Sequence, residues 1–163
     1  MGLITTAEQL AEAIVSDPER VAACLGRINR FGGQVPNCTV LRHSLHVFER
    51  VDSDPDVSDA ARLWALLHDC HEILTGDVVR PYVNARLRMD QWQIDEVIVR
   101  RLGSRVPFAE SPDGKLVAAA DRAVGEFEML EIGQDRAPYD VCGDAEKSWA
   151  DLVRELITIG GAA

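Results

Sequence analysis

Long apolar runs and a basic, apolar leader are both missing from this chain of 163 residues. No stretch reaches the roughly 18 apolar residues that a membrane-spanning helix requires. The N-terminal segment MGLITTAEQLAEAIVSDPER also lacks the pattern of a secretory signal. The sequence therefore predicts a cytoplasmic protein that has no membrane partner.

Paired cysteines are missing as well, because the four cysteines form no CxxC motif. Thiols in a chain without a secretory signal are expected to be reduced, and thiols beside apolar runs are mostly buried. These cysteines are Cys24, Cys38, Cys70 and Cys142. They predict no disulfide framework.

Positive charge is scarce in the chain. It has 17 Lys and Arg against 27 Asp and Glu, which gives a formal net charge of −10. Binding along a nucleic acid depends on neutralising its phosphates with Lys and Arg, so a nucleic acid polymer is not an expected partner. An anionic substrate would have to be small and be met by a local cluster of arginines.

Apolar residues are present in the proportion of a globular protein, at 47% of the chain. The length allows one domain with a full core and is too short for two ordinary domains. Helix-start signals recur along the chain, and no alternating strand pattern occurs. The sequence predicts an all-α fold, a single domain over residues 1–163 that forms a bundle of about six to eight helices.

Several helix boundaries follow from cap and turn residues. The second helix is expected to end at the glycine pair 32–33. A third helix is expected over residues 39–51, and a fourth, strongly apolar one over residues 60–74. Asp90 is expected to cap the helix that follows.

The stretch LLHDCHEILTGDVVRP, residues 66–81, gathers ionisable groups where the apolar helix ends. At about 100° per residue, Asp69 and Glu72 share one sector with His68, whereas His71 falls outside it. An imidazole beside a carboxylate suits a borderline divalent metal. The alternative for an isolated pair is a hydrogen bond between imidazole and carboxylate in a helix end. A structural zinc site that uses His71, Cys70 or His46 is not expected, because these side chains point to other sectors and lack a four-ligand spacing.

Two other helices each offer one further donor. His43 stands at the edge of the apolar face of helix 39–51. Asp121 follows five consecutive apolar residues, 116–120, so its carboxylate should be partly buried, which is costly unless it is paired or metal-bound. A salt bridge to Arg122 or another arginine is the alternative for Asp121. Together with the His-Asp pair, these residues offer two imidazoles and two carboxylates to one divalent ion.

The order of these donors resembles the HD superfamily of metal-dependent phosphohydrolases, in which a His, a His-Asp pair and an Asp follow one another in a helical domain. Here the spacings are 25 and 52 residues. The blocks RHSLHVF, ALLHDCHEILTGDVVRP and AADRAVGEFE, with INRFGG upstream, are similar to those of the bacterial 5'-deoxynucleotidases of that superfamily and their compact phage relatives. They span about residues 28–128, roughly two thirds of the chain. The resemblance implies a single HD-type helical bundle.

Carried over position by position, the resemblance implies one bound divalent ion. The implied ligands are His43, His68, Asp69 and Asp121. The resemblance also implies that Glu72 and Asp77 handle protons and orient the attacking water, and that Arg30 meets the phosphate. We add Arg80 as a substrate-binding residue, because it lies close to the expected site. Phe31 is a candidate for stacking on a nucleobase, with a place in the core as the alternative.

The function that the resemblance implies is a 5'-deoxynucleotidase, which removes phosphate from 2'-deoxynucleoside 5'-monophosphates with the help of one Mn, Co, Zn or Mg ion. The alternative enzyme is a triphosphohydrolase that releases triphosphate from dNTPs. A third hypothesis is a catalytically silent HD binding module, which the presence of every ligand and both acids disfavours. A small nucleotide is the expected partner, and the resemblance implies a homodimer.

Overall fold

Helices build the fold in the computed structural model, which describes residues 2–79, 82–103, 110–134, 136, 138 and 144–159. In that part of the chain, the only strand-like feature is an isolated bridge between Asn29 and Thr39. The expected all-α class is confirmed. No described helix is both long and apolar enough to cross a membrane.

Eight α-helices and one short 3-10 helix follow one another along the described residues. Seven of the α-helices have at least eight residues, and α5 is a single turn, in agreement with the expected bundle of six to eight. Their bounds are α1 (Ala7–Ser16), α2 (Pro18–Leu25), η1 (Phe31–Gly33), α3 (Val40–Asp52), α4 (Asp59–Leu67), α5 (Glu72–Thr75), α6 (Ala85–Leu102), α7 (Pro112–Gly133) and α8 (Ala145–Ile159).

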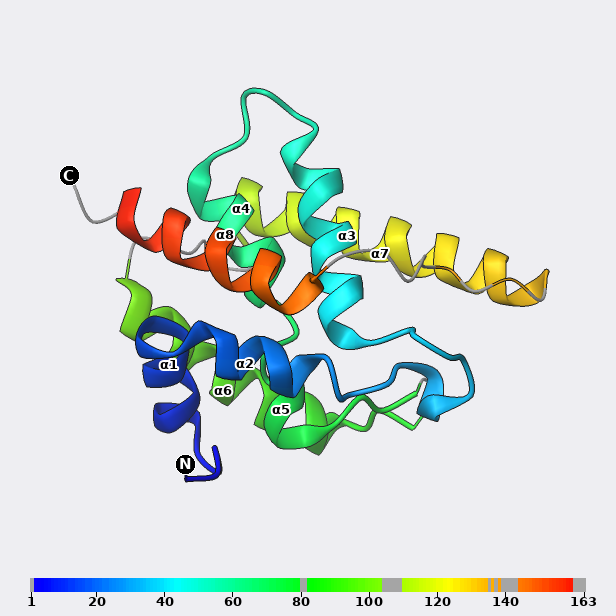
Figure 1. Cartoon of the computed structure of the whole chain (residues 1–163), viewed down its shortest axis with the longest axis horizontal. Helices are drawn as coiled ribbons and strands as arrows, with labels where there is room; N and C mark the ends of the chain where they lie inside the picture. The colour runs from blue at the N-terminus through cyan, green and yellow to red at the C-terminus, as the bar shows by residue number, and fades with distance from the viewer. Residues whose placement is uncertain are drawn as a thin grey trace.

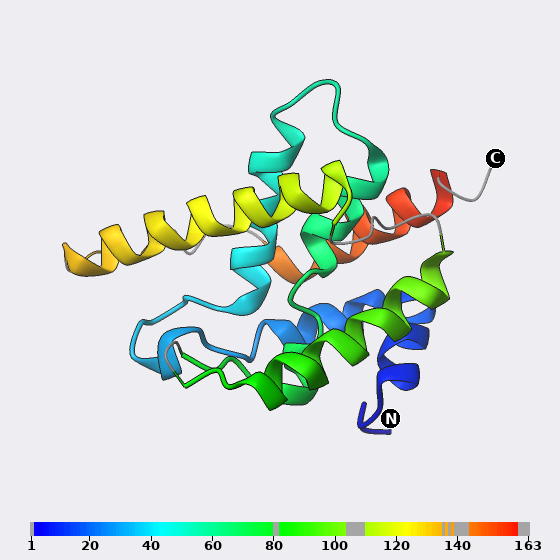
Figure 2. The ribbon, with the colours of Figure 1, turned by 180° about the vertical axis from the view of Figure 1, so that it is seen from behind.

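The arrangement of the helices brings α3, α4 and α7 together. Figure 1 shows α1, α2, α5 and α6 on one side of the molecule and α3, α4, α7 and α8 on the other. α1 packs on α2 and α6, and α2 packs on α8. α7 lies against both α3 and α4, and its C-terminal half extends beyond the other helices in both views (Figure 2). The three helices that carry the predicted metal ligands are therefore neighbours.

Two clusters of buried apolar side chains stabilise this arrangement. The larger one joins α1, α2, α3, α4, α6 and α8 and includes Leu66 and Trp149, which have no exposed surface. The smaller one lies among α3, α4 and α7. Phe48 and Trp64 pack against both clusters. Because α3 and α4 contribute to both clusters, they are packed on two sides.

The fourth helix is shorter than the sequence predicts. α4 ends at Leu67, residues 68–71 form turns, and α5 begins at Glu72, whereas one continuous helix was expected over residues 60–74. Apolar residues before and after the turn face the same core, as Leu66 and Ile73 do. Hydrophobic periodicity alone therefore does not reveal the end of the helix.

The predicted end of the second helix is also wrong. α2 ends at Leu25 with Gly26 as its C-cap. The following segment pairs with the residues before α3, because the backbone N–H of Arg30 donates to the Cys38 carbonyl at 2.8 Å. The glycine pair 32–33 serves η1 instead, where φ values of 63° and 75° favour glycine.

The predicted cap of the sixth helix is wrong as well, because Asp90 lies inside α6. The N-cap is Asn84, whose side-chain oxygen accepts from the backbone N–H of Leu87 at 2.9 Å. Asn84 also has a side chain suited to the N-cap, and it precedes Asp90 in the sequence. The helix therefore begins before Asp90.

Candidate metal centre

Side chains terminate α4 by taking the carbonyl oxygens of its last turn. The final carbonyls of a helix have no partner within the helix. The Ala65 carbonyl accepts from Nδ1 of His68 at 2.9 Å. The Leu66 carbonyl accepts from the indole N–H of Trp149, on α8, at 3.2 Å. These two bonds fix the chain at the point where His68 and Asp69 leave the helix.

The bond to Ala65 also determines which nitrogen of His68 faces the site. Because Nδ1–H donates to the carbonyl, Nε2 carries the lone pair of the neutral ring. Nε2 lies 3.3 Å from Oδ2 of Asp69 and 3.8 Å from Oδ1 of Asp121. This buried atom has no hydrogen-bond partner among the described residues. It has the position and the chemistry of a metal-ligand atom.

The second imidazole, that of His43 on α3, is held from behind by a buried carboxylate. Its Nδ1 lies 2.9 Å from Oε1 of Glu128, and neither side chain is exposed. Its Nε2 lies 3.0 Å from Oδ1 of Asp121 and 3.7 Å from Oδ2 of Asp69. A carboxylate behind an imidazole orients the ring and makes the opposite nitrogen a better ligand.

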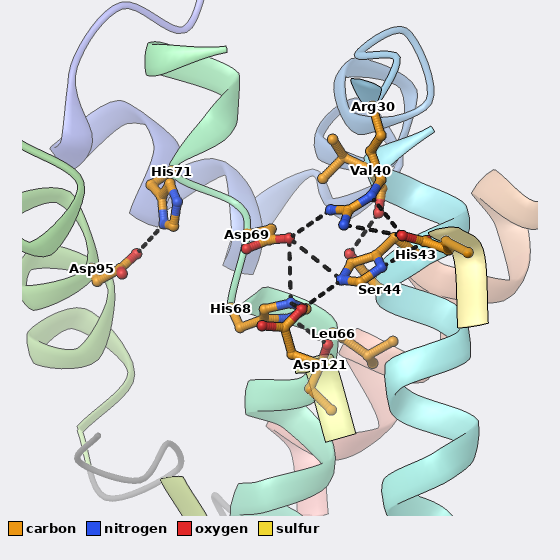
Figure 3. Close-up of polar contacts among 12 residues, drawn as sticks. Arg30, Val40, His43, Ser44, Leu66, His68, Asp69, His71, Asp95 and Asp121 are labelled. Carbon is orange, nitrogen blue, oxygen red and sulfur yellow. Dashed lines mark hydrogen bonds and ion pairs between the residues drawn. The ribbon is translucent and has the colours of Figure 1, made fainter. Parts of the chain in front are cut away.

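The four predicted metal ligands converge from α3, the end of α4 and α7 (Figure 3). The ligand atoms of His43, His68 and Asp69 all lie within 4.8 Å of one another. Oδ1 of Asp121 is close to Nε2 of both imidazoles, and this side chain is 35% exposed. Two imidazoles and two carboxylates suit a divalent ion of the first transition row. The buried cluster therefore has the donors to hold such an ion.

The charges of these donors are coupled in the cation-free protein. Burial favours a neutral His43, but its hydrogen bonds to Asp121 and Glu128 raise its pKa above 6.5. Burial likewise opposes charge on His68, whose pKa is nevertheless raised by Asp69 and Asp121. Burial disfavours both of these carboxylates as anions, yet the imidazoles hold their pKa values below the usual 3.8. A cation that binds here must displace protons from the imidazoles.

Arg30 places a positive charge at the edge of the donor set. Its Nη1 lies 3.5 Å from Oδ2 of Asp69, and its Nε and Nη2 lie 3.2 Å and 3.1 Å from Oε2 of Glu128. Burial lowers the pKa of this guanidinium, but the neighbouring carboxylates more than offset that effect. Phe31 is half-buried, with its ring 5.6 Å from the Cζ atom of Arg30. It packs on the guanidinium and is not part of the fully buried core.

Glu72 and Asp77 lie beyond Asp69, and neither has a full set of hydrogen bonds. Asp77 accepts from the backbone N–H groups of Phe31 and Gly32, which links the loop after α5 to η1. Oε2 of Glu72 and Oδ2 of Asp77 have no hydrogen-bond partner within the described part of the chain. Burial, followed by the charges of Asp69 and Asp77, raises the pKa of Glu72 to about 9. This raised pKa favours the protonated form of Glu72 near neutral pH.

His71 lies closer to the site than the sequence predicts. The turn over residues 68–71 breaks the helical register, so angles calculated from a continuous helix do not apply. The ligand atoms of Asp69, His71 and Glu72 lie within 4.8 Å of one another. The prediction that His71 points away from this sector is therefore wrong, and so is the reason given for excluding it as a metal ligand.

Two charged residues that support the imidazoles were missed in the sequence. Glu128 follows Asp121 by seven residues on α7, two helical turns later, and this spacing places both on one face. Asp95, on α6, has its Oδ1 3.0 Å from Nδ1 of His71. No local sequence pattern links Asp95 to His71, because the two residues lie on separate elements. Arg80, the remaining substrate-binding prediction, lies outside the described residues.

Comparison with known proteins finds no match to this chain, either among the models of protein families or among curated proteins.

Proposed function

We propose that this chain is a divalent-cation-dependent phosphohydrolase that removes phosphate from nucleoside 5'-monophosphates, with 2'-deoxynucleotides preferred. The observation that carries the proposal is the position of Arg30 beside the donor set, with Nη1 3.5 Å from Oδ2 of Asp69. A phosphate that reaches the donors for a cation also reaches a guanidinium. The choice of nucleotides rests on the resemblance to the HD superfamily.

The ligands for the ion would be His43, His68, Asp69 and Asp121. A divalent cation at such a site supplies a Lewis acid that polarises a phosphoryl oxygen and activates water near neutral pH. Two observations support this use of the donors: Nε2 of His68 has no hydrogen-bond partner among the described residues, and a carboxylate lies behind His43.

Arg30 would bind and orient the phosphoryl group. A guanidinium has five N–H groups, and each of its terminal nitrogens carries two of them. Contacts with Asp69 and Glu128 hold the group in place, and further N–H groups can donate to phosphate oxygens. Arg30 is one of the positive charges that an acidic chain needs beside an anionic substrate.

Glu72 and Asp77 would move the protons of the reaction. Glu72 holds a proton near neutral pH and can donate it to the oxygen that leaves with the nucleoside. Asp77 is anchored to the η1 backbone and has an oxygen without a hydrogen-bond partner in the described chain, which can orient the attacking water. The presence of both acids supports an enzyme over a silent binding module.

The direct test is product analysis with purified protein reconstituted with Mn²⁺ or Co²⁺. dAMP, AMP and dATP are supplied side by side, with Asp69→Ala as the inactive control. We expect orthophosphate from dAMP, slower release from AMP, and intact dATP. Inorganic triphosphate from dATP would replace this proposal with a dNTP triphosphohydrolase. No product from any of the three would overturn the proposed nucleotide activity.

A further inference from the structure

The backbone of η1 is left-handed over three consecutive residues. Phe31, Gly32 and Gly33 have φ values of 56°, 63° and 75°. This conformation is costly for a bulky residue such as Phe31, and it persists only where surrounding contacts fix it. Glycine adopts it without that cost. Two of the three positions therefore carry glycine, and contacts around the turn must hold the third.

Backbone hydrogen bonds fix the place of this turn. The N–H of Arg30 donates to the Cys38 carbonyl at 2.8 Å, which joins the two strands of chain on either side of the turn. Inside the turn, the N–H of Gly33 donates to the Arg30 carbonyl at 3.2 Å. Neither bond uses the N–H groups of Phe31 and Gly32, which therefore remain available to another acceptor.

That acceptor is the carboxylate of Asp77, which takes both N–H groups. Successive backbone N–H groups in a turn form a concave donor site for an anion. Val79 lies beside the turn as well, with its Cγ2 3.9 Å from the position that a Cβ atom on Gly32 would take. Figures 1 and 2 both show the loop after α5 beside η1. Oδ2 of Asp77 has no hydrogen-bond partner among the described residues, so the turn orients an oxygen that can accept from another molecule.

We propose that Gly32 is a positioning residue, whose left-handed backbone directs two N–H groups at Asp77 and so fixes the orientation of this carboxylate. What the oriented carboxylate then does rests on the proposed function, in which Asp77 orients the attacking water. Arg30 has its own contacts with Asp69 and Glu128. A change at Gly32 should therefore lower kcat and leave the KM of the substrate nearly unchanged.

Two substitutions at Gly32 separate backbone conformation from side-chain size. A Cβ atom there would make only ordinary contacts, 3.8 Å from Nε2 of Gln34 and 3.9 Å from Cγ2 of Val79. Valine disfavours a φ of 63°, whereas asparagine tolerates it. The variants are therefore Gly32→Val and Gly32→Asn. Gly103→Val is the matched control, because Gly103 has the same φ at the exposed end of α6 and no atom within 4 Å of the added Cβ.

Steady-state kinetics with dAMP and Mn²⁺ measure the effect on turnover. We expect kcat to fall about 100-fold in Gly32→Val, because a misplaced catalytic group lowers the rate steeply. Gly32→Asn should recover most of the loss, and Gly103→Val should keep the wild-type kcat. Circular dichroism verifies that the variants remain folded. Wild-type kcat in Gly32→Val, or an equal loss in Gly32→Asn, would overturn the proposal.

Amide hydrogen exchange, followed by NMR in the cation-free protein, tests the contact itself and requires no substrate. The amides of Phe31 and Gly32 should exchange slowly in the wild type and at least about 10-fold faster in Asp77→Ala. Equal exchange in these two proteins would overturn the proposal even if dAMP is hydrolysed. Slow exchange that depends on Asp77, in a protein that hydrolyses no nucleotide, would support the positioning role and overturn only the proposed nucleotide activity.

Discussion

Glu128 is a buried carboxylate shared by two functional side chains. One oxygen contacts Nδ1 of His43, and the other contacts the guanidinium of Arg30. Both partners depend on it for orientation, because Glu128 has no exposed surface. In the proposed function, a change at Glu128 should therefore weaken binding of the cation and of the phosphate without touching either directly.

Glu128→Gln should weaken Mn²⁺ binding by about 10- to 100-fold, because His43 loses the charged acceptor that orients it. Isothermal titration calorimetry measures the affinity. The control is Glu126→Gln, which removes the same charge from an exposed position of α7 and should leave the affinity unchanged. Equal effects in the two variants would mean that net charge, and not the contact with His43, sets the affinity.

Glu72→Gln should abolish turnover and leave the ion held by His43 and His68 in place. The amide cannot exchange the proton that Glu72 holds near neutral pH, and Glu72 is not among the ligands of that ion. Asp69→Ala should remove metal and activity together. Bound metal and product formation are measured on the same samples. If Glu72→Gln loses as much metal as Asp69→Ala does, the proton-transfer role is wrong.

The break between α4 and α5 is the element on which the site depends. Local cap residues mark several helix starts, such as Thr6 before α1 and Ser111 before α7, whose side chains accept from backbone N–H groups. The end of α4 has no such cap residue. The carbonyls of its last turn accept instead from the imidazole of His68 and from the indole of the distant Trp149. A contact across 83 residues cannot be read from periodicity.

The same reasoning explains what could be predicted of the site. The four predicted metal ligands follow from residue types at the edges of apolar helix faces and from the resemblance that their spacing suggested. The structure brings them together. Glu128 and Asp95 act through contacts between elements, so the sequence shows only that they are present. His71 was placed wrongly because the turn at residues 68–71 was missed.

Trp149→Phe should destabilise the protein by about 1–3 kcal/mol, because the buried Leu66 carbonyl loses its donor. Urea unfolding followed by circular dichroism gives the free energy of unfolding. Trp92→Phe is the control on α6, where the side chain is 55% exposed, and it should change this value by less than about 0.5 kcal/mol. If the two variants match, the indole bond does not stabilise the end of α4.

At the scale of the whole molecule, the cation-free protein should lose stability as the pH rises from about 5 to about 9. The pKa values of His43, His68 and Glu72 are all raised by the fold. Between its unfolded and folded pKa values, each group binds more protons in the folded state, so raising the pH favours unfolding. The lowered pKa values of Asp69 and Asp121 act only in acid, below 3.8.

Differential scanning calorimetry in the presence of a chelator measures this effect. We expect the melting temperature to fall by roughly 5 °C between about pH 6 and pH 9, which corresponds to one or two kcal/mol for a domain of this size. Saturating Mn²⁺ should remove the fall, because the ion replaces the protons that the donors release. A melting temperature that rises with pH in the chelated protein would contradict the raised pKa values.

The donor set is assembled from segments that are distant along the chain. The contact between His43 and Asp121 spans 78 residues, and that between Arg30 and Glu128 spans 98. Contacts of such separation form late in folding, after the local helices. While the chain is being synthesised, His43, His68 and Asp69 leave the ribosome before their partners on α7 exist. We therefore expect the nascent chain to bind the proposed ion only after α7 has emerged, so that metal loading would mark the docking of α7 against α3 and α4.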